Sequence, residues 1–235
     1  MKICPTFMEL SLFILQNKWI LELLYALLIA SICFIIFLKT DKFFRLSLHH
    51  GIKYFRNAFL FYGVAFVTRY IFGVFSDFSI DYSDILRVFF EYFLIMAGFF
   101  LLYSLVWKKF DTEKDSSMFN GRIIVFHAIA LVIAVLDNLW GTYLFMFASQ
   151  IIVFLSASLI SYSNYRKNGK KHKFLNFYFV TMLMGLAAWV MNLLVAFYFH
   201  WRHMVLLDIG IINTIFFLLF LYGVIKITKN GSKKA

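Results

Sequence analysis

The sequence contains one proline, two cysteines and few charged residues. The single proline is Pro5, near the N-terminus. Transporters whose helices are interrupted at mid-membrane usually carry Gly or Pro at the breaks, so this scarcity disfavours that kind of fold. Cys4 and Cys33 are expected to lie at different depths in the membrane, too far apart for a disulfide. Neither a disulfide framework nor a cysteine-ligated metal centre is expected.

Motifs for catalysis are also missing. The sequence has no HExxH zinc motif, no phosphate-binding P-loop and no GxSxG nucleophile motif. The longest segment expected to lie outside the membrane, residues 108–122, is too short to bury a core of its own. The sequence therefore predicts a protein that is not an enzyme and that passes any signal to a separate partner.

Hydrophobic residues dominate the chain. They make up 63% of its 235 residues, charged residues make up 15%, and there are 32 phenylalanines. A soluble domain is nearer half apolar and a quarter charged. In a bilayer every backbone polar group must be paired within the protein, which leaves helices or a closed barrel. The apolar runs are continuous rather than alternating, so they predict helices.

Seven apolar runs are long enough to cross a bilayer, which requires about 20 residues each. They predict an all-α polytopic transmembrane helix bundle with seven spans. A short outer or interfacial segment, residues 1–18, comes first, and a basic tail, residues 226–235, comes last. The first run is too long for a cleaved signal peptide, so it is expected to be a retained span. The predicted spans are residues 19–38, 54–75, 85–107, 123–140, 143–162, 174–199 and 204–225.

The positions of the charges predict the orientation. The formal net charge is +11, and most Lys and Arg residues follow the first, third, fifth and seventh runs. The segment after the second run, residues 76–84, is acidic. By the positive-inside rule the N-terminus lies outside and the C-terminus is cytoplasmic, with anionic lipid headgroups beside the basic segments. This placement favours the plasma membrane and disfavours nucleic acid as a partner.

Polar residues within the runs are candidates for a binding site, because they are costly in a bilayer. All lie in the outer half of the predicted bundle. Arg69 is expected to pair with Glu91 or Asp208, although Arg87 stands four residues before Glu91 and offers it a local partner. Such groups near the interface can also extend their polar ends to water. The predicted ligand-binding residues are Arg69, Glu91, Gln150, Asn192 and Asp208.

The sixth run carries small residues along one face. Gly185, Ala188 and Ala196 share that face with Asn192. Small residues let transmembrane helices approach closely, and an amide can form a hydrogen bond across the contact. This pattern predicts a helix-packing seam.

The layout of seven helices with an outside N-terminus resembles that of microbial rhodopsins and of seven-helix receptors. A retinal protein needs a lysine within its last helix for the Schiff base. Residues 204–225 contain none, and Lys226 lies at the end of that run. Retinal is therefore disfavoured, and no other cofactor is expected.

These observations predict a seven-helix sensor or receptor-like module. An outward-facing polar pocket would bind a small ligand, and a cytoplasmic or membrane protein partner would carry the signal onward. Two alternatives remain open at this point: a transporter or channel subunit for a small solute or ion, and a structural membrane assembly protein.

Overall fold

The computed structural model describes residues 18–47, 50–72, 83–110, 121–168, 173–198 and 203–231. Within these ranges the chain is helical and has no strand. The predicted all-α fold is confirmed for this part of the chain. The side chains of Lys18, Glu22 and Asp208 lie outside the described set, although the helices that carry them are described.

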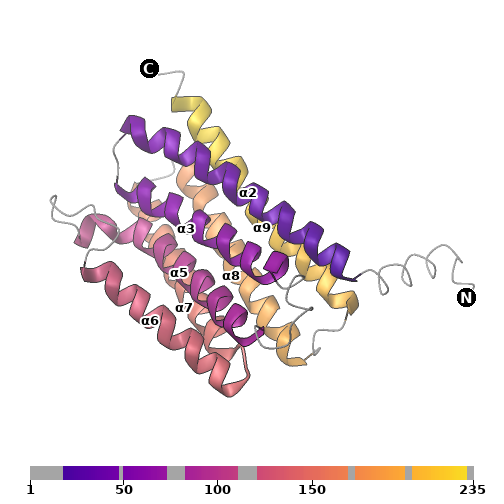
Figure 1. Ribbon diagram of the computed structural model, residues 1–235. Helices are drawn as coiled ribbons and strands as arrows, with labels where there is room; N and C mark the ends of the chain where they lie inside the picture. The colour runs from indigo at the N-terminus through magenta and orange to yellow at the C-terminus, as the bar shows by residue number, and fades with distance from the viewer. Residues whose placement is uncertain are drawn as a thin grey trace, which may run out of the picture.

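Seven α-helices and one π-helical segment make up the described structure (Figure 1). Consecutive helices run in opposite directions, and η1 continues directly from α3. The elements are α2 (Lys18–Ser47), α3 (His50–Phe66), η1 (Val67–Phe72), α5 (Ser83–Phe110), α6 (Gly121–Trp140), α7 (Leu144–Asn168), α8 (Lys173–Tyr198) and α9 (His203–Gly231).

Five segments of these helices are long and apolar enough to cross a membrane. Their outward faces carry exposed Leu, Ile and Phe side chains such as Phe34, Leu139 and Ile152, which in lipid need no cover. A shorter apolar stretch, Gly210–Lys226, lies on α9. The chain is thus a helical protein of the membrane type. The five segments are Leu23–Arg45, Asp84–Trp107, Gly121–Trp140, Leu144–Lys167 and Asn176–Tyr198.

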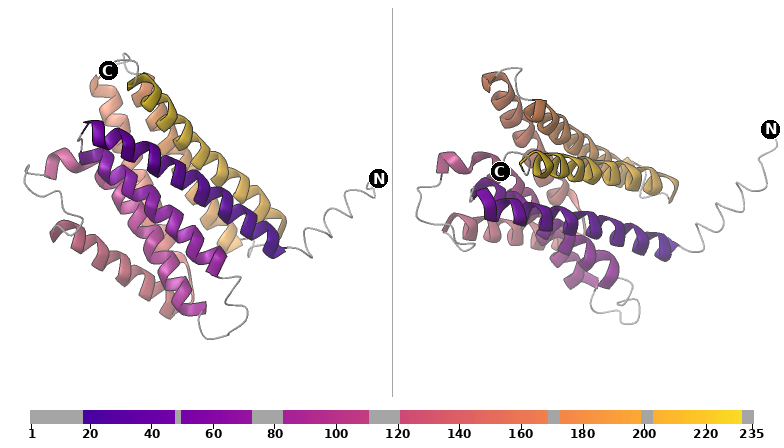
Figure 2. Two further views of the ribbon diagram at one scale, coloured as in Figure 1. Left: turned by 45° about the horizontal axis from the view of Figure 1, so that its top comes forward. Right: turned by 90° about the horizontal axis from the view of Figure 1, so that it is seen from above.

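Six of the helices form a closed ring. Going around it, α2 packs on α3, α3 on α5, α5 on α7, α7 on α8, α8 on α9, and α9 returns to α2. Helix α6 lies outside this ring and packs mainly against α5 and α7. Figure 1 and the left view of Figure 2 show α6 at the edge of the bundle, away from α2 and α9.

Aromatic rings fill the middle of the ring of helices. The Phe59 ring on α3 lies 5.0 Å from that of Phe220 and 6.4 Å from that of Phe217, both on α9. The Tyr62 and Phe217 rings meet edge to face at 5.5 Å. Such edge-to-face pairs are favourable beyond the area they bury. These pairs join α3 to α9 on the inner side of α2, so they hold together the two helices that flank α2.

Helix α8 packs through small residues. Gly185, Ala188 and Asn192 are buried, and α8 contacts α7 and α9. A Cβ atom on Gly185 would lie 2.5 Å from the Phe154 ring and 2.6 Å from the Phe216 ring. The glycine therefore makes room for two rings from two neighbouring helices. Ala196, a further member of this face, is half-buried.

We expect Gly185→Ala to lower the free energy of unfolding by about 1–3 kcal/mol, the usual cost of overpacking a core. Phe154 and Phe216 are both buried, so neither ring has space to withdraw. Thermal unfolding in detergent micelles measures the effect. Gly121→Ala is the matched control, because a Cβ atom there meets nothing within 4 Å. Equal midpoints for the two variants would contradict this account of the seam.

Candidate functional site: a charged cluster at the α6–α7 hairpin

Helices α6 and α7 are joined by a tight turn at Gly141. The Gly141 N–H donates to the Asn138 carbonyl at 3.1 Å, and the Thr142 N–H donates to the Asp137 carbonyl at 3.1 Å. This is the Schellman pattern of a helix C-terminus, in which the residue after the helix adopts a left-handed conformation. Gly141 has φ of 63°, which glycine adopts without steric penalty. The turn thus reverses the chain within three residues.

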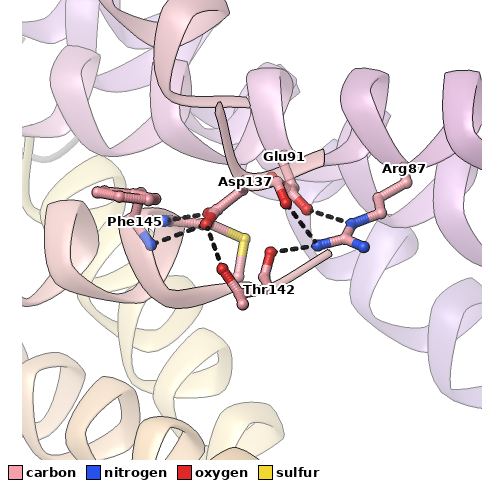
Figure 3. Close-up of polar contacts among 6 residues, drawn as sticks. Arg87, Glu91, Asp137, Thr142 and Phe145 are labelled. Carbon is pink, nitrogen blue, oxygen red and sulfur yellow. Dashed lines mark hydrogen bonds and ion pairs between the residues drawn. The ribbon is translucent and has the colours of Figure 1, made fainter. Parts of the chain in front are cut away.

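Asp137 caps the start of α7 from the end of α6. Its Oδ1 accepts a hydrogen bond from the Phe145 N–H at 2.9 Å, and its Oδ2 accepts one from the Met146 N–H at 2.6 Å (Figure 3). The Thr142 hydroxyl adds a third donor at 3.3 Å. The first N–H groups of a helix have no intrahelical partner, and they carry partial positive charge. The fully buried Asp137 carboxylate is therefore compensated by α7 itself.

Arg87 on α5 holds the same turn from the other side. Its Nη2 donates to the backbone carbonyl of Asp137 at 3.3 Å and also to that of Thr142. Its Nε donates to Glu91 Oε1 at 2.9 Å, an ion pair between residues one turn apart. The C-terminal end of a helix attracts cations because its last carbonyls are unpaired. Arg87 therefore adds a second donor to the Asp137 carbonyl, supplies a donor to the Thr142 carbonyl in the turn and ties the hairpin to α5 (Figure 3).

Tyr143 lies between two guanidinium groups. The Arg87 guanidinium carbon is 4.1 Å from the centroid of the Tyr143 ring, and that of Arg69 is 5.8 Å away. Arg69 belongs to the π-helical segment η1 and also lies 4.7 Å from the centroid of the Phe90 ring. Cations are attracted to the faces of aromatic rings, more strongly where water is excluded. Tyr143 thus links η1 to α5 and to the hairpin.

We call Arg69, Arg87, Glu91, Asp137, Thr142 and Tyr143 the hairpin cluster. Two guanidinium groups and two carboxylates balance one another within it. Within the cluster, one buried side-chain atom has no hydrogen-bond partner among the described residues: Glu91 Oε2, on a side chain with 0% exposure. A buried acceptor without a donor is costly, more so when it belongs to a charged group. Glu91 is therefore the point in the cluster where a further donor would be stabilising.

Gln150 lies deeper along the same α5–α7 contact. Its Nε2 donates to the Leu94 carbonyl on α5 at 3.0 Å, and Leu94 is three residues beyond Glu91. A Cβ atom at Gly98 would lie 2.8 Å from Gln150 Oε1, so the amide fits against a glycine on α5. This contact joins α5 to α7 by a hydrogen bond inside the bundle.

Asn192 takes part in a separate polar contact between α8 and α9. Its Nδ2 donates to Asn213 Oδ1 at 3.1 Å, and Asn213 Nδ2 donates back at 3.4 Å. The same Nδ2 also donates to the Ala188 carbonyl at 2.7 Å. The reciprocal amide pair satisfies both side chains across the helix interface, as expected for polar residues in a membrane bundle.

The predicted site residues thus fall into different places. Arg69 and Glu91 meet in the hairpin cluster, Gln150 lies one turn deeper, and Asn192 belongs to the α8–α9 amide pair. The Asp208 side chain lies outside the described residues. The i, i+4 spacing correctly indicated Arg87 as the partner of Glu91. Tyr143 had no signal in the sequence, since its role depends on the close approach of η1 and α5 to the hairpin. Among the described residues, no three His, Cys, Asp or Glu side chains are grouped to hold a metal ion.

Comparison with known proteins gives one relevant similarity. A protein of Archaeoglobus fulgidus, described only as an uncharacterized protein, is 27% identical over 192 residues, which cover 76% of this chain and 80% of that protein. No protein-family model matches the chain, and no solved structure matches it. The hairpin cluster is therefore interpreted from its own chemistry.

We expect Arg87→Ala to lower the free energy of unfolding by about 3–5 kcal/mol, because it leaves the Glu91 carboxylate buried without its partner. Arg45→Ala is the matched control. Arg45 and Asp41 form an ion pair with the same spacing and the same 2.9 Å distance, but the Arg45 side chain is 79% exposed, and exposed pairs contribute little. Unfolding in mixed detergent micelles compares the two. Similar losses for both variants would show that the cluster does not stabilise the hairpin.

Proposed function

We propose that the protein is a seven-helix receptor-like module of the plasma membrane. In this proposal the N-terminus lies outside, the hairpin cluster faces the outer side, and a separate partner receives the signal at the inner side. The observation that carries the proposal is the hairpin cluster itself. It is a charge-balanced group at one end of the bundle that joins η1, α5 and the α6–α7 hairpin and leaves one buried acceptor unpaired.

Seven crossings are supported by the lengths of the two helices outside the five apolar segments. Helix α3 has 17 residues and η1 adds 6, which together give about 34 Å of helix at the standard rise. Helix α9 has 29 residues. Both exceed the hydrocarbon core of a bilayer, which is about 30 Å thick. Since both helices also belong to the closed ring, we infer that they cross the membrane with their neighbours.

The exposed charges support the orientation. Basic side chains are exposed near the C-terminal ends of α2, α7 and α9 and near the start of α6. With alternating helix directions these ends lie together, opposite the α6–α7 turn. Positive charge favours the cytoplasmic side, where anionic headgroups or an acidic partner surface would meet it. The exposed basic residues are Lys39, Lys42, Arg45, Arg122, Arg166, Lys167, Lys226 and Lys229.

The interior supports a receptor rather than a conducting path. Between α3 and α9 the centre of the ring of helices is packed with aromatic rings, among them Phe59, Phe217 and Phe220. The buried amides of Gln150 and Asn192 are engaged in helix-to-helix hydrogen bonds. A change at the hairpin cluster would reach the inner end through these rigidly packed helices.

Labelling of single cysteines tests the orientation. Cys4 and Cys33 are replaced, and single cysteines are placed by Ser79→Cys, Lys167→Cys and Lys229→Cys. A membrane-impermeant maleimide added to intact cells is expected to label only the variant at position 79, because the other two positions belong to the basic inner side. Labelling at position 167 or 229 without permeabilisation would overturn the N-terminus-outside, seven-span proposal.

A second measurement tests the receptor role. We expect Arg69→Gln to change the labelling rate at Lys229→Cys in permeabilised cells, because the cluster and the inner end belong to one packed ring of helices. Lys42→Gln, a change of an exposed charge far from the cluster, is the control. Unchanged rates in the Arg69 variant, or a solute flux by the purified protein in liposomes, would contradict a receptor.

A further inference from the structure

We propose that the ligand of the hairpin cluster is a proton, and that Glu91 Oε2 accepts it from the outer aqueous side. This inference rests on the proposed function and gives the signal its chemical identity. One O–H bond forms at Oε2, and the proton comes from a hydronium ion at the outer surface, which is left as water. The protein would then report the acidity of the medium outside the cell.

The enclosure of Glu91 favours a ligand of this size. The Glu91 side chain is 0% exposed, and its Oε1 is occupied by the Arg87 Nε–H at 2.9 Å. Oε2 has no hydrogen-bond partner in the described ranges. A proton needs no cavity. The Arg87 side chain, 18% exposed, brings the pair to the edge of the bundle, where water has access to it.

Glu91, unlike the other carboxylate of the cluster, has an oxygen that no hydrogen bond occupies. Asp137 already accepts from the Phe145 N–H, the Met146 N–H and the Thr142 hydroxyl. Both Asp137 oxygens are therefore occupied as the cap of α7. A proton on Asp137 would have to displace one of these bonds, whereas a proton on Glu91 Oε2 displaces none.

The charged groups around Glu91 come from three elements. Arg87 is on the same helix as Glu91, Asp137 is on α6 and Arg69 is on η1, and the Tyr143 ring in the turn before α7 contacts both arginines. Before protonation the two carboxylates balance the two guanidinium groups. Protonation of Glu91 removes one of these negative charges. Arg69 and Arg87 then face the same Tyr143 ring with less negative charge beside them, and like charges in a largely buried site repel more strongly than in water.

This repulsion acts between the α6–α7 hairpin, which Arg87 holds, and η1, which carries Arg69. Arg87 holds the carbonyls of Asp137 and Thr142 at the turn, so its displacement pulls on the α6–α7 hairpin. Helix α6 lies outside the ring and packs mainly on α5 and α7. On the other side Arg69 is carried by η1, whose π-helical hydrogen bonding is rarer and less favourable than α-helical bonding. The hairpin and η1 are therefore expected to separate when Glu91 is protonated.

A fluorophore at the end of α6 tests this inference. In a chain lacking Cys4 and Cys33, Leu139→Cys is labelled with an environment-sensitive dye, because Leu139 is 75% exposed and near the turn. The purified protein in nanodiscs is titrated from about pH 8 to about pH 4, which spans the titration of carboxyl groups. We expect a single-step change in emission in the otherwise unchanged chain and loss of that change in Glu91→Gln, with emission fixed at the acid value.

Two further variants make the result decisive. Asp41→Asn removes a carboxylate that also pairs with arginine, at the other end of the bundle, and should leave the response intact. Glu91→Asp keeps a titratable group but draws it away from Arg87, so its midpoint should shift. If Glu91→Gln does not fold, the shift of the midpoint in Glu91→Asp tests the inference instead.

An absent response, a response that survives Glu91→Gln, or an unshifted midpoint in Glu91→Asp would overturn the proton as ligand. None of these outcomes alters the maleimide labelling pattern or the effect of Arg69→Gln on the inner end. Failure of this inference is therefore distinguishable from failure of the proposed function.

Discussion

The contact between Arg87 and the backbone carbonyls of the α6–α7 turn determines how one end of this bundle is built. A helix that ends close to the bilayer core leaves carbonyl groups for which little water is at hand. Arg87 supplies donors to two carbonyls of the turn, and Asp137 supplies acceptors to the first amides of α7. Each group is costly to bury alone. Placed together, they compensate the end of one helix and the start of the next.

Elsewhere in the bundle polar groups serve packing. The Gln150 amide bonds to a backbone carbonyl on α5, and Asn192 and Asn213 satisfy each other between α8 and α9. Neither contact involves a charged group, although Gln150 Oε1 has no hydrogen-bond partner in the described part of the chain. The hairpin cluster differs because it combines formal charges from several elements, so that a change of one charge disturbs all of them. The polar residues that join pairs of helices are thus distinct from the charged residues of the hairpin cluster.

The sequence was sufficient to predict the helical membrane-type fold, because long apolar runs have few physical solutions. The Arg87–Glu91 pair could also be predicted, because i, i+4 spacing on a helix brings the two side chains together. The grouping of Asn192 with Arg69 was not supported by the structure, which pairs Asn192 with Asn213. Depth along a span can be calculated from residue number, but the direction in which a side chain points around the bundle depends on which helices are neighbours.

The same limit explains Tyr143 and Asp137. Tyr143 is one of 13 tyrosines, and nothing nearby in sequence marks it as the ring between two arginines. Asp137 is a helix cap whose partners lie eight and nine residues further along, beyond the usual N-cap spacing. Only the turn at Gly141 brings it to the start of α7. A contact that depends on a single turn, or on the approach of several helices, cannot be predicted from a local sequence pattern.

The contact between α2 and α9 has a consequence for biogenesis. These two helices are far apart in sequence, yet they are neighbours in the ring. Until α9 has been synthesised and inserted, the earlier helices form an open arc whose inner aromatic face, including Phe59 and Tyr62, is exposed to lipid. Formation of a long-range contact of this kind carries the entropy cost of closing a large loop. The ring of helices is therefore closed only after α9 has been inserted, and a chain truncated before α9 would leave its aromatic core available to other membrane proteins.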